Sequence, residues 1–429
     1  MRTRLALLPL LVLLGACAAR TVPAPVPGPA PAVVVGAKPS QITTVPLGRS
    51  AGAAPAPAPA PAPVAQAPAP TVVALEPEID TPEGQVQALS FDDLTGWADG
   101  DHMPVLLALR TACDKLLDAP VDSSVGGHDV GGVPLFGTGG DWSAPCRAAT
   151  GANDATGYFE KHFAPVALGG SEGPAALFTA YYEPELRGSR TRGGIYQHPL
   201  YALPDDLRSG VPYFDRAAID AGALAGRGLE IFWLADPVES FFLHIQGSGR
   251  IRLPDGTVAR VGYAGKNNRA YKAVGRTLVE WNELPLEGMS KRKIEDWVAA
   301  NPARRDELLG TNPSYVFFTE REELNADPSL GPIGAFGQPL PNQRAIAIDR
   351  RYYALGIPVW VDFASPVGPV QRLTLALDTG GAIKGSRRAD FFFGSGEAAG
   401  KAAGATRTRG RLIALTPRTA YERVFGPIS

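Results

Sequence analysis

The stretch that decides the fold covers residues 373–396 and reads LTLALDTGGAIKGSRRADFFFGSG. It starts as an apolar strand, turns at a Gly pair, and continues through two Arg into three consecutive Phe. Asp378 ends the apolar strand, and Asp390 follows twelve residues later, between Ala389 and the Phe run. A carboxyl group among apolar side chains loses hydration, which raises its pKa and suits it to act as a general acid. The segment therefore predicts buried β structure that carries candidate catalytic carboxylates.

A third aspartate, Asp349, ends a similar apolar strand in the run Ile346-Ala347-Ile348-Asp349. The aspartates also have a plain structural interpretation. An Asp that precedes Thr-Gly, as Asp378 does, typically starts a turn by bonding nearby amides with its side chain. The residue pattern alone favours Asp390 as the catalytic carboxyl over Asp378 and Asp349, because apolar residues surround it most closely.

Short apolar or alternating runs, separated by Gly and Pro, fill most of the chain after residue 150. Such runs predict β-strands, and many short strands with turns between them are typical of barrels or sandwiches. Helical periodicity predicts helices over 102–117, 268–281 and 290–300, the last with Ser290 as its N-cap. The predicted strands cover residues 176–182, 229–234, 240–246, 258–263, 315–319, 344–348, 359–363, 372–377 and 411–415.

The composition excludes several classes of protein. Gly (49) and Pro (41) make up about a fifth of the 429 residues, against about 12% in an average protein. Both residues break helix interiors, which argues against coiled coils and long helical bundles. Lys and Arg (41) nearly balance Asp and Glu (43), so no basic excess indicates a nucleic-acid partner. Three Cys, five His and the lack of a His-Glu-x-x-His or paired Cys-x-x-Cys motif predict no metal site and no cofactor.

The N-terminus has the pattern of a secretory signal. Arg2 and Arg4 precede an apolar run over 5–14 that is too short to span a bilayer. The next residues, Leu14-Gly15-Ala16-Cys17, resemble a bacterial lipobox, in which the Cys becomes the lipidated first residue of the mature chain. A plain cleaved signal with a coincidental Cys is the alternative. Ala18 rather than Asp follows the Cys, which in such lipoproteins implies the outer membrane, with the protein facing the periplasm.

Residues 18–80 are mostly Pro, Ala and Val and predict a semi-rigid polyproline tether. At about 3 Å per residue the tether could extend over about 100 Å or more. Cys113 and Cys146 lie in the folded part that follows. An oxidising compartment favours a disulfide between them, and two buried thiols are the alternative. About 340 folded residues exceed what one hydrophobic core serves, so two domains are expected.

Five runs stand out in order between residues 150 and 415: Phe178–Pro184, His244–Gly249, Tyr263–Asn267, Asn312–Phe318 and Asp378–Asp390. Together they resemble the membrane-bound lytic murein transglycosylase A family, and the lipobox agrees with this resemblance independently. The resemblance is weakest before residue 150. The family has a C-terminal domain named for three Asp, and Asp349, Asp378 and Asp390 match that set.

The resemblance implies a mainly β fold, in which a double-psi β-barrel domain with a few helices contains an inserted second β-barrel domain. The predicted boundaries place the signal peptide at 1–17 and the tether at 18–80. They divide the double-psi barrel between 81–185 and 319–429, and the inserted domain covers 186–318. Members of the family bind glycan in the groove between the two domains.

The resemblance also implies a reaction, the cleavage of the MurNAc-β-1,4-GlcNAc bond of peptidoglycan with formation of 1,6-anhydro-MurNAc ends. Asp390 is then the single acid/base, and Asp378 supports it. Ordinary glycosidases use two carboxylates. One suffices here because the C6 hydroxyl of the muramyl sugar is the nucleophile and needs no separate base.

Five residues are predicted to bind the glycan. Gln246 suits N-acetyl or hydroxyl groups and Gly247 lets the backbone approach a sugar, although a strand-end turn explains both equally well. Tyr181 and Tyr182 could stack on sugar faces or belong to the core, and Tyr182 is the one counted among the five. Lys266 could line the groove or a hairpin turn, and Asp349 completes the set.

The expected partners are peptidoglycan glycan strands and the outer membrane, the latter through a lipid anchor on Cys17. Complexes for cell-wall synthesis or hydrolysis are further candidate partners, and no nucleic acid is expected. Two alternative functions stay open at this point. One is a non-catalytic peptidoglycan-binding envelope lipoprotein, and the other is a hydrolase that leaves reducing ends.

Overall fold

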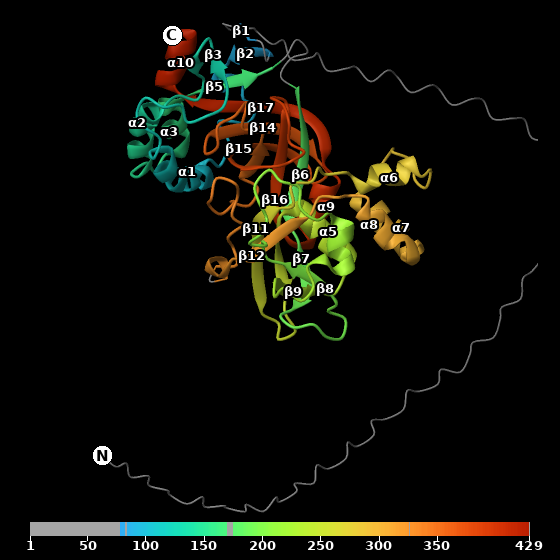
Figure 1. The fold of residues 1–429 in the computed structure, drawn as a ribbon. Coiled ribbons are helices and arrows are strands. Elements are labelled where there is room, and N and C mark those ends of the chain that lie inside the picture. The colour runs from blue at the N-terminus through green and yellow to red at the C-terminus, as the bar shows by residue number, and fades with distance from the viewer. Residues whose placement is uncertain (1–77, 82–83, 170–174, 326, 429) are drawn as a thin grey trace, which may run out of the picture. The chain divides into compact units, whose positions relative to one another are not determined.

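The computed structural model describes residues 78–428, apart from 82–83, 170–174 and 326. The predicted signal peptide with Cys17 and nearly all of the predicted tether lie outside the described residues. Two β-sheets with helices around them make up most of the described part (Figure 1). No helix within that part is long and apolar enough to cross a membrane.

The larger sheet contains nine strands: β1 (Glu78–Thr81), β2 (Gly84–Ala88), β5 (Phe163–Leu168), β6 (Ala175–Glu183), β13 (Ala345–Ile348), β14 (Pro358–Ser365), β15 (Gly368–Thr379), β16 (Arg388–Ser395) and β17 (Arg407–Pro417). Six of them close into a barrel in the order β17-β14-β15-β13-β16-β6, because β17 pairs with both β14 and β6. The other three continue the sheet from β17 in the order β5-β2-β1. A separate short sheet pairs β3 (Asp129–Val130) with β4 (Val133–Pro134).

The smaller sheet is built from one continuous stretch of chain between β6 and β13. Its order is β12-β11-β10-β7-β9-β8, from the strands β7 (Glu185–Ser189), β8 (His198–Tyr201), β9 (Glu230–Leu234), β10 (Ser248–Arg252), β11 (Val258–Lys266) and β12 (Val316–Glu320). The predicted fold class is confirmed as a mainly β chain whose barrel carries an inserted β unit. The exact domain boundaries stay predictions.

Two of the predicted helices are confirmed. The helix predicted over 102–117 is α1 (Met103–Leu116), and the one over 290–300 is α7 (Lys291–Ala300), where the Ser290 hydroxyl accepts the Lys293 N–H as an N-cap does. The other α-helices of the described part are α2 (Gly139–Ala149), α3 (Ala155–His162), α4 (Arg216–Ala218), α5 (Pro237–Gln246), α6 (Val274–Glu280), α8 (Arg305–Gly310), α9 (Gly396–Gly404) and α10 (Arg418–Phe425).

The Phe run that follows Asp390 fixes β16 in the barrel core. Phe391 is fully buried, as are Phe178 of β6 and Trp360 of β14. The rings of Phe178 and Phe363 stack with centroids 4.4 Å apart, and Phe391 meets Phe363 edge-on at 5.4 Å. Burial of one such ring contributes roughly 1.5–3 kcal/mol. The packing of Phe391 therefore also fixes the position of its neighbour Asp390.

A disulfide joins α1 to α2. Cys113 and Cys146 have Cα atoms 5.5 Å apart and form this bond, so of the two alternatives left by the sequence the structure contains the disulfide. Covalent closure of a loop reduces the entropy of the unfolded chain. The bond thus stabilises the helices that cover one side of the barrel.

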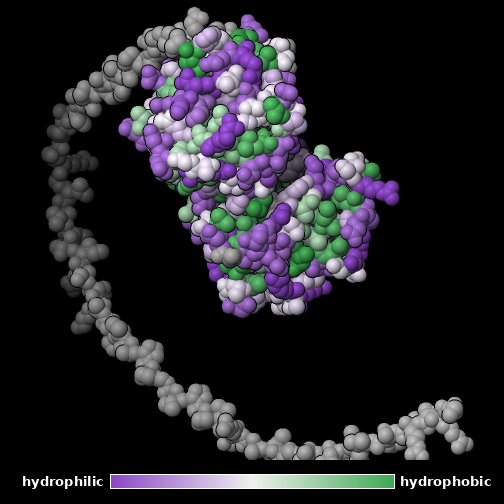
Figure 2. All heavy atoms as spheres, turned by 90° about the vertical axis from the view of Figure 1, so that its left-hand side faces the viewer, coloured by the Kyte–Doolittle hydropathy of each residue, from purple (hydrophilic) through white to green (hydrophobic). Residues whose placement is uncertain are grey.

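Figure 2 shows a face of the described part on which polar and apolar residues are interspersed.

The predicted strand over 240–246 is wrong, because these residues belong to helix α5. Asp236 caps the helix by accepting two backbone N–H bonds of its first turn, at 2.7 and 3.1 Å. A proline follows at the first helical position, and Gly247 ends the helix with a φ of 79°. These start and stop signals outweigh the apolar alternation that suggested a strand. The other predicted strands are confirmed as β6, β9, β11, β12, β13, β14, β15 and β17.

The helix predicted over 268–281 begins only at Val274, as α6. Its predicted first turn is held in a loop by side-chain hydrogen bonds. The Asn267 amide donates to two backbone carbonyl groups of distant loops, at 2.9 and 2.7 Å. Asn268 adopts a left-handed conformation with a φ of 56°, which is incompatible with an α-helix.

Candidate active site

Ala347 on β13 has a candidate carboxylate on each side. β13 lies between β15 and β16, and its register pairs Ala347 with Asp378 on one neighbour and with Asp390 on the other. Residues opposite each other on paired strands present their side chains to the same face of a sheet. Asp378 and Asp390 therefore face the same side of the barrel wall, with their Cα atoms two strand spacings, roughly 10 Å, apart. A register shift next to Ala347 is the kind of irregularity that re-aims side chains at functional sites.

Asp390 is held by a chain of hydrogen bonds from β6. Thr179 lies opposite Asp390 in the register of β6 and β16, and its hydroxyl donates to Asp390 Oδ1. The same hydroxyl oxygen accepts from Arg388 Nη2 at 2.6 Å. Since a guanidinium only donates, and no other described group accepts from Thr179, the hydroxyl proton belongs to the bond with Asp390. Oδ1 is thus an acceptor, which leaves Oδ2 as the oxygen that can carry a proton.

The surroundings of Asp390 raise its pKa. The largest cause is burial of the carboxyl, and the charge of Asp378 acts in the same direction. The bond from Thr179 and the charge of Arg388 act in the opposite direction, because both favour the ionised form. Part of the residue stays accessible. The carboxyl is therefore poorly hydrated and yet within reach of a ligand, which is what a general acid requires.

Asp378 accepts three hydrogen bonds at the end of β15. Its Oδ1 accepts the backbone N–H groups of Ala335 and Thr379 at 3.0 and 2.9 Å, and its Oδ2 accepts the Tyr181 hydroxyl at 2.9 Å. Burial raises the pKa of Asp378, and the three bonds oppose that rise. Burial and then the nearby Asp378 charge raise the pKa of Tyr181 well above its usual value. The phenol of Tyr181 therefore keeps the proton that it donates.

Strand alternation separates Tyr181 from Tyr182. Thr179 and Tyr181 of β6 face the two carboxylates, so Tyr182 faces the opposite side. There the Tyr182 hydroxyl accepts from Lys291 Nζ at 3.4 Å, and its ring lies against Gly400, where an added Cβ would come within 2.7 Å of the ring. The sequence analysis considers both tyrosines for stacking on sugars, counts only Tyr182 among the glycan-binding residues, and gives Thr179 no role. The alternation of side chains along β6 puts Thr179 and Tyr181 on one face of the strand and Tyr182 on the other. Only the pairing of β6 with β16 shows which of the two faces carries the site.

Gln246 links α5 to β6, because its Oε1 accepts the Tyr182 N–H at 3.2 Å. Gly247 ends α5 in the left-handed conformation that favours glycine. Lys266 is exposed at the end of β11, opposite Val316 of β12, and none of its described contacts reaches the carboxylates. Glycan binding by Gln246, Gly247, Lys266 and Tyr182 stays a prediction.

Asp349 is engaged by protein donors. Its Oδ2 lies 2.6 Å from Arg351 Nη2 and accepts the Gly385 N–H at 2.8 Å. The hydrogen bond from Arg351 is the largest cause that holds the pKa of Asp349 below its usual range, so the group is ionised. These contacts hold the loop between Asp378 and Asp390. Glycan binding by Asp349 stays a prediction.

Glu183 joins the barrel to the smaller sheet. It ends β6, is fully buried, and lies 2.8 Å from both Arg250 of β10 and Arg260 of β11. Ser395 of β16 donates to the same carboxylate at 2.7 Å. Loss of one partner of such a buried pair typically costs about 3–5 kcal/mol, because the other charge stays buried without compensation. This cluster therefore holds the end of β6 against β10 and β11.

Two family models match the chain. Residues 177–319 match the MltA specific insert domain, and residues 344–416 match the 3D domain. The membrane-bound lytic murein transglycosylase A of Vibrio cholerae serotype O1 is 35% identical over 257 residues, which are 58% of this chain and 67% of that protein. The protein of the same name from Escherichia coli K12 is 34% identical over 258 residues, with the same coverage of each chain.

Solved structures agree with these relatives. The membrane-bound lytic murein transglycosylase of Agrobacterium tumefaciens has a TM-score of 0.68 and 32% identity, over 79% of this chain and 99% of that chain. E. coli MltA with bound chitohexaose has a TM-score of 0.54 and 29% identity, over 65% and 82% of the respective chains. The barrel, the insert and the aspartate-bearing strands therefore have their counterparts in one group of enzymes: the chain belongs to the membrane-bound lytic murein transglycosylase A family.

Proposed function

We propose that this protein cleaves the MurNAc-β-1,4-GlcNAc bond of peptidoglycan and leaves 1,6-anhydro-MurNAc ends. The observation that carries the proposal is Asp390, a carboxyl with a raised pKa that shares a face of the barrel with Asp378. Further support comes from the names of the relatives, which are lytic murein transglycosylases. One solved relative holds chitohexaose, a linear sugar chain.

In this mechanism Asp390 acts first as an acid and then as a base. Its Oδ2 donates a proton to the oxygen between the two sugars, the C1–O bond breaks, and GlcNAc leaves with that proton. The C6 hydroxyl of the same muramyl sugar bonds to C1 and returns its proton to Oδ2. One C–O bond forms for each that breaks, so water is not consumed. Between the two steps the hydrogen bond from Thr179 to Oδ1 stabilises the carboxylate.

Asp378 supports this cycle through its charge. A negative charge there raises the pKa of Asp390 and stabilises the positive charge that develops at C1. The bonds from Tyr181 and two backbone N–H groups hold the carboxylate in place. We further propose that Gln246, Gly247, Tyr182, Lys266 and Asp349 contribute to glycan binding, directly or by positioning the groove.

The product of the wild-type protein on purified peptidoglycan tests the proposal. We expect soluble muropeptides with anhydro ends, which mass spectrometry distinguishes from hydrolysis products because they lack one water. Reducing ends in place of anhydro ends would contradict the reaction and favour a hydrolase. Binding to the wall without any soluble muropeptide would favour a non-catalytic wall-binding lipoprotein.

We also propose that a lipid on Cys17 anchors the protein to the outer membrane, facing the periplasm, with residues 18–80 as a spacer. The lipobox pattern and the description of the relatives as membrane-bound support this location. Cys17→Ala is expected to move the protein from the detergent-extracted membrane fraction to the soluble fraction after cell lysis. A variant that still required detergent would contradict the anchor.

A further inference from the structure

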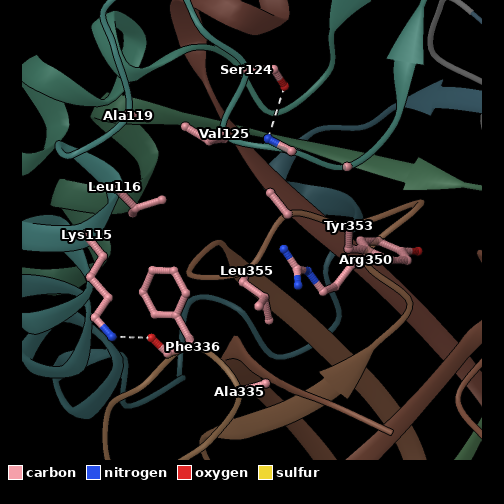
Figure 3. Close-up of a pocket in the computed structure, with 13 residues that line it drawn as sticks. Lys115, Leu116, Ala119, Ser124, Val125, Ala335, Phe336, Arg350, Tyr353 and Leu355 are labelled. Atoms are coloured by element: carbon pink, nitrogen blue, oxygen red, sulfur yellow. Dashed lines mark hydrogen bonds between the residues drawn. The ribbon is translucent and has the colours of Figure 1, made fainter. Parts of the chain in front are cut away.

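A cavity of about 320 Å³ opens beside the aspartate-bearing strands (Figure 3). Its walls come from the C-terminal end of α1, the Gly-rich loop 124–127 and the segments 335–336 and 350–355. Its walls combine polar groups with the apolar side chains of Leu116, Val125, Phe336 and Leu355. Asp378 and Asp390 do not line this cavity, so it is a separate site on the barrel.

Among the described residues, two cations and no acid line the cavity. Lys115 Nζ donates to the Phe336 carbonyl oxygen at 2.5 Å, whereas Arg350 has no hydrogen-bond or ion-pair partner among the described residues. Its neighbour Arg351 is paired with Asp349. Figure 3 shows the Arg350 guanidinium between Tyr353 and Leu355, directed into the cavity. A guanidinium beside apolar side chains favours an anion such as a carboxylate, with which it forms two parallel hydrogen bonds.

The lining is unsuited to a sugar. Hydroxyl and N-acetyl groups are usually recognised by carboxylates and side-chain amides, and no Asp, Glu, Asn or Gln of the described part of the chain lines the cavity. Ser124 is its one side-chain hydroxyl besides Tyr353, and it accepts the Gly126 N–H at 3.0 Å. Tyr353 donates its own hydroxyl to the Ser386 carbonyl oxygen at 2.8 Å. The chemistry that remains is an apolar body with a free carboxylate.

The cavity has a lining residue that contacts Asp378 directly. Ala335 lines it and donates its N–H to Asp378 Oδ1 at 3.0 Å, and Phe336 donates its N–H to the Leu377 carbonyl oxygen at 2.9 Å. The peptide stems of peptidoglycan start on the muramyl sugar, which sits at Asp390 during cleavage. Asp378, which Ala335 contacts, lies two strand spacings, roughly 10 Å, from Asp390. An extended stem of four residues, at about 3.3 Å each, spans a similar distance.

We propose that this cavity binds a free carboxylate of a peptidoglycan peptide stem, with Arg350 as its partner and the apolar side chains of the walls against the adjoining side chain. This rests on the proposed function, because the stem arrives with the glycan that is cut. The site would make the protein prefer glycan that carries stems over bare glycan. Lys115 adds positive charge at the same mouth while holding the Phe336 segment in place.

Kinetics on two substrates test this preference. One is purified peptidoglycan with its stems, and the other is the same glycan after an amidase has removed them. Arg350→Ala is expected to raise KM on the stem-bearing glycan roughly tenfold, as loss of a hydrogen bond to a charged group does, and to leave the bare glycan within about twofold. Arg350→Lys should recover part of the loss. Equal losses on both substrates, or none on either, would overturn the proposal.

A matched control removes a charge elsewhere. Arg292→Ala on α7 loses an exposed Arg whose only described ion pair is with Asp296, one turn along the helix, and such pairs contribute little to stability. Its kinetics on both substrates should equal those of the wild type. If Arg292→Ala showed the same loss as Arg350→Ala, general attraction between opposite charges would explain the data and the pocket assignment would fail.

Binding of the stem alone separates this proposal from the proposed function. Titration of the full chain with a free stem tetrapeptide, followed by calorimetry or NMR, requires no cleavage. Wild type is expected to bind, and Arg350→Ala to bind at least roughly tenfold more weakly. Absence of binding by the wild type, or equal binding by the variant, would overturn the pocket assignment even in a protein that cleaves peptidoglycan. Stem binding by a protein that cleaves nothing would keep the pocket and reject the reaction.

Discussion

Replacement of Asp390 by Asn is expected to lower kcat on purified peptidoglycan by about 10³-fold, within the 10²–10⁴-fold that a general acid or base contributes. The asparagine side chain is nearly the same shape, and its Oδ1 could still accept the Thr179 hydroxyl that now bonds Asp390. It has no proton to give to the leaving oxygen and cannot take one from the C6 hydroxyl. The measurement is the initial rate of release of anhydromuropeptides by wild type and variant.

Thermal unfolding checks that Asp390→Asn still folds. Burial raises the folded-state pKa of Asp390, so the protonated carboxyl contributes stability that is complete below the unfolded pKa and is lost as the pH rises through the folded pKa. Asn cannot ionise and avoids this loss. At neutral pH the variant should therefore unfold at the same temperature as the wild type or a higher one.

Asp362→Asn is a suitable control for Asp390→Asn. Asp362 lies on β14 of the same barrel, and its described side-chain hydrogen bond is accepted from the Gln371 amide at 3.1 Å. The control should keep the activity and the unfolding temperature of the wild type. Release of anhydro product by Asp390→Asn at the wild-type rate would remove Asp390 from the mechanism. A large loss in Asp362→Asn would show that the assay reports barrel integrity rather than chemistry.

Replacement of Thr179 by Val is expected to move the alkaline limb of the pH–rate profile to higher pH. The Thr179 hydroxyl lowers the pKa of Asp390 by bonding its ionised form. Val removes that bond, so the carboxyl holds its proton to higher pH, by about one unit if the bond contributes about 1.4 kcal/mol. kcat at the optimum should fall about tenfold or more, because the carboxylate formed after the first step loses a donor worth a similar energy.

Thr179→Ser separates a role in proton placement from a role in packing. Ser keeps the hydroxyl that accepts from Arg388 and donates to Asp390, so it should restore the wild-type pH profile despite the lost methyl group. The profile of kcat against pH is the measurement for both variants. An alkaline limb that moved to lower pH in Thr179→Val would show that Arg388 then pairs directly with Asp390. An unchanged limb, or the same shift in Ser and Val, would contradict the assigned role.

Most strands could be predicted from the sequence because their signals are local. The apolar runs that become β13, β15 and β17 pair with distant segments of the chain. The alternation or the apolar content of each run is nevertheless typical of a β-strand and of no other element. The error at 240–246 has the same local origin. The apolar alternation suggested a strand. The cap at Asp236, the proline after it and the stop at Gly247 outweigh that signal and together specify helix α5.

The residues of the candidate site also fall into those that a local sequence pattern indicates and those that it does not. Asp378 and Asp390 could be selected because a carboxyl beside an apolar strand is chemically unusual wherever the strand lies. The hydrogen bonds that Thr179 and Tyr181 donate to these aspartates could not be predicted, because Thr and Tyr on a β-strand are ordinary residues. They become part of the site only where β6 pairs with β16, more than two hundred residues away along the chain.

A mainly β fold, a resemblance to the lytic murein transglycosylases and the candidate aspartates could all be inferred from the amino-acid sequence. These properties follow from composition, local periodicity and short motifs. The contacts between distant segments place Ala347 between Asp378 and Asp390 and direct the Thr179 hydroxyl through Arg388. They also leave Arg350 without a partner among the described residues, at the cavity beside α1. The physical reason is that strand register and cavity walls depend on contacts between distant segments, and no local pattern specifies which distant segment will be the partner.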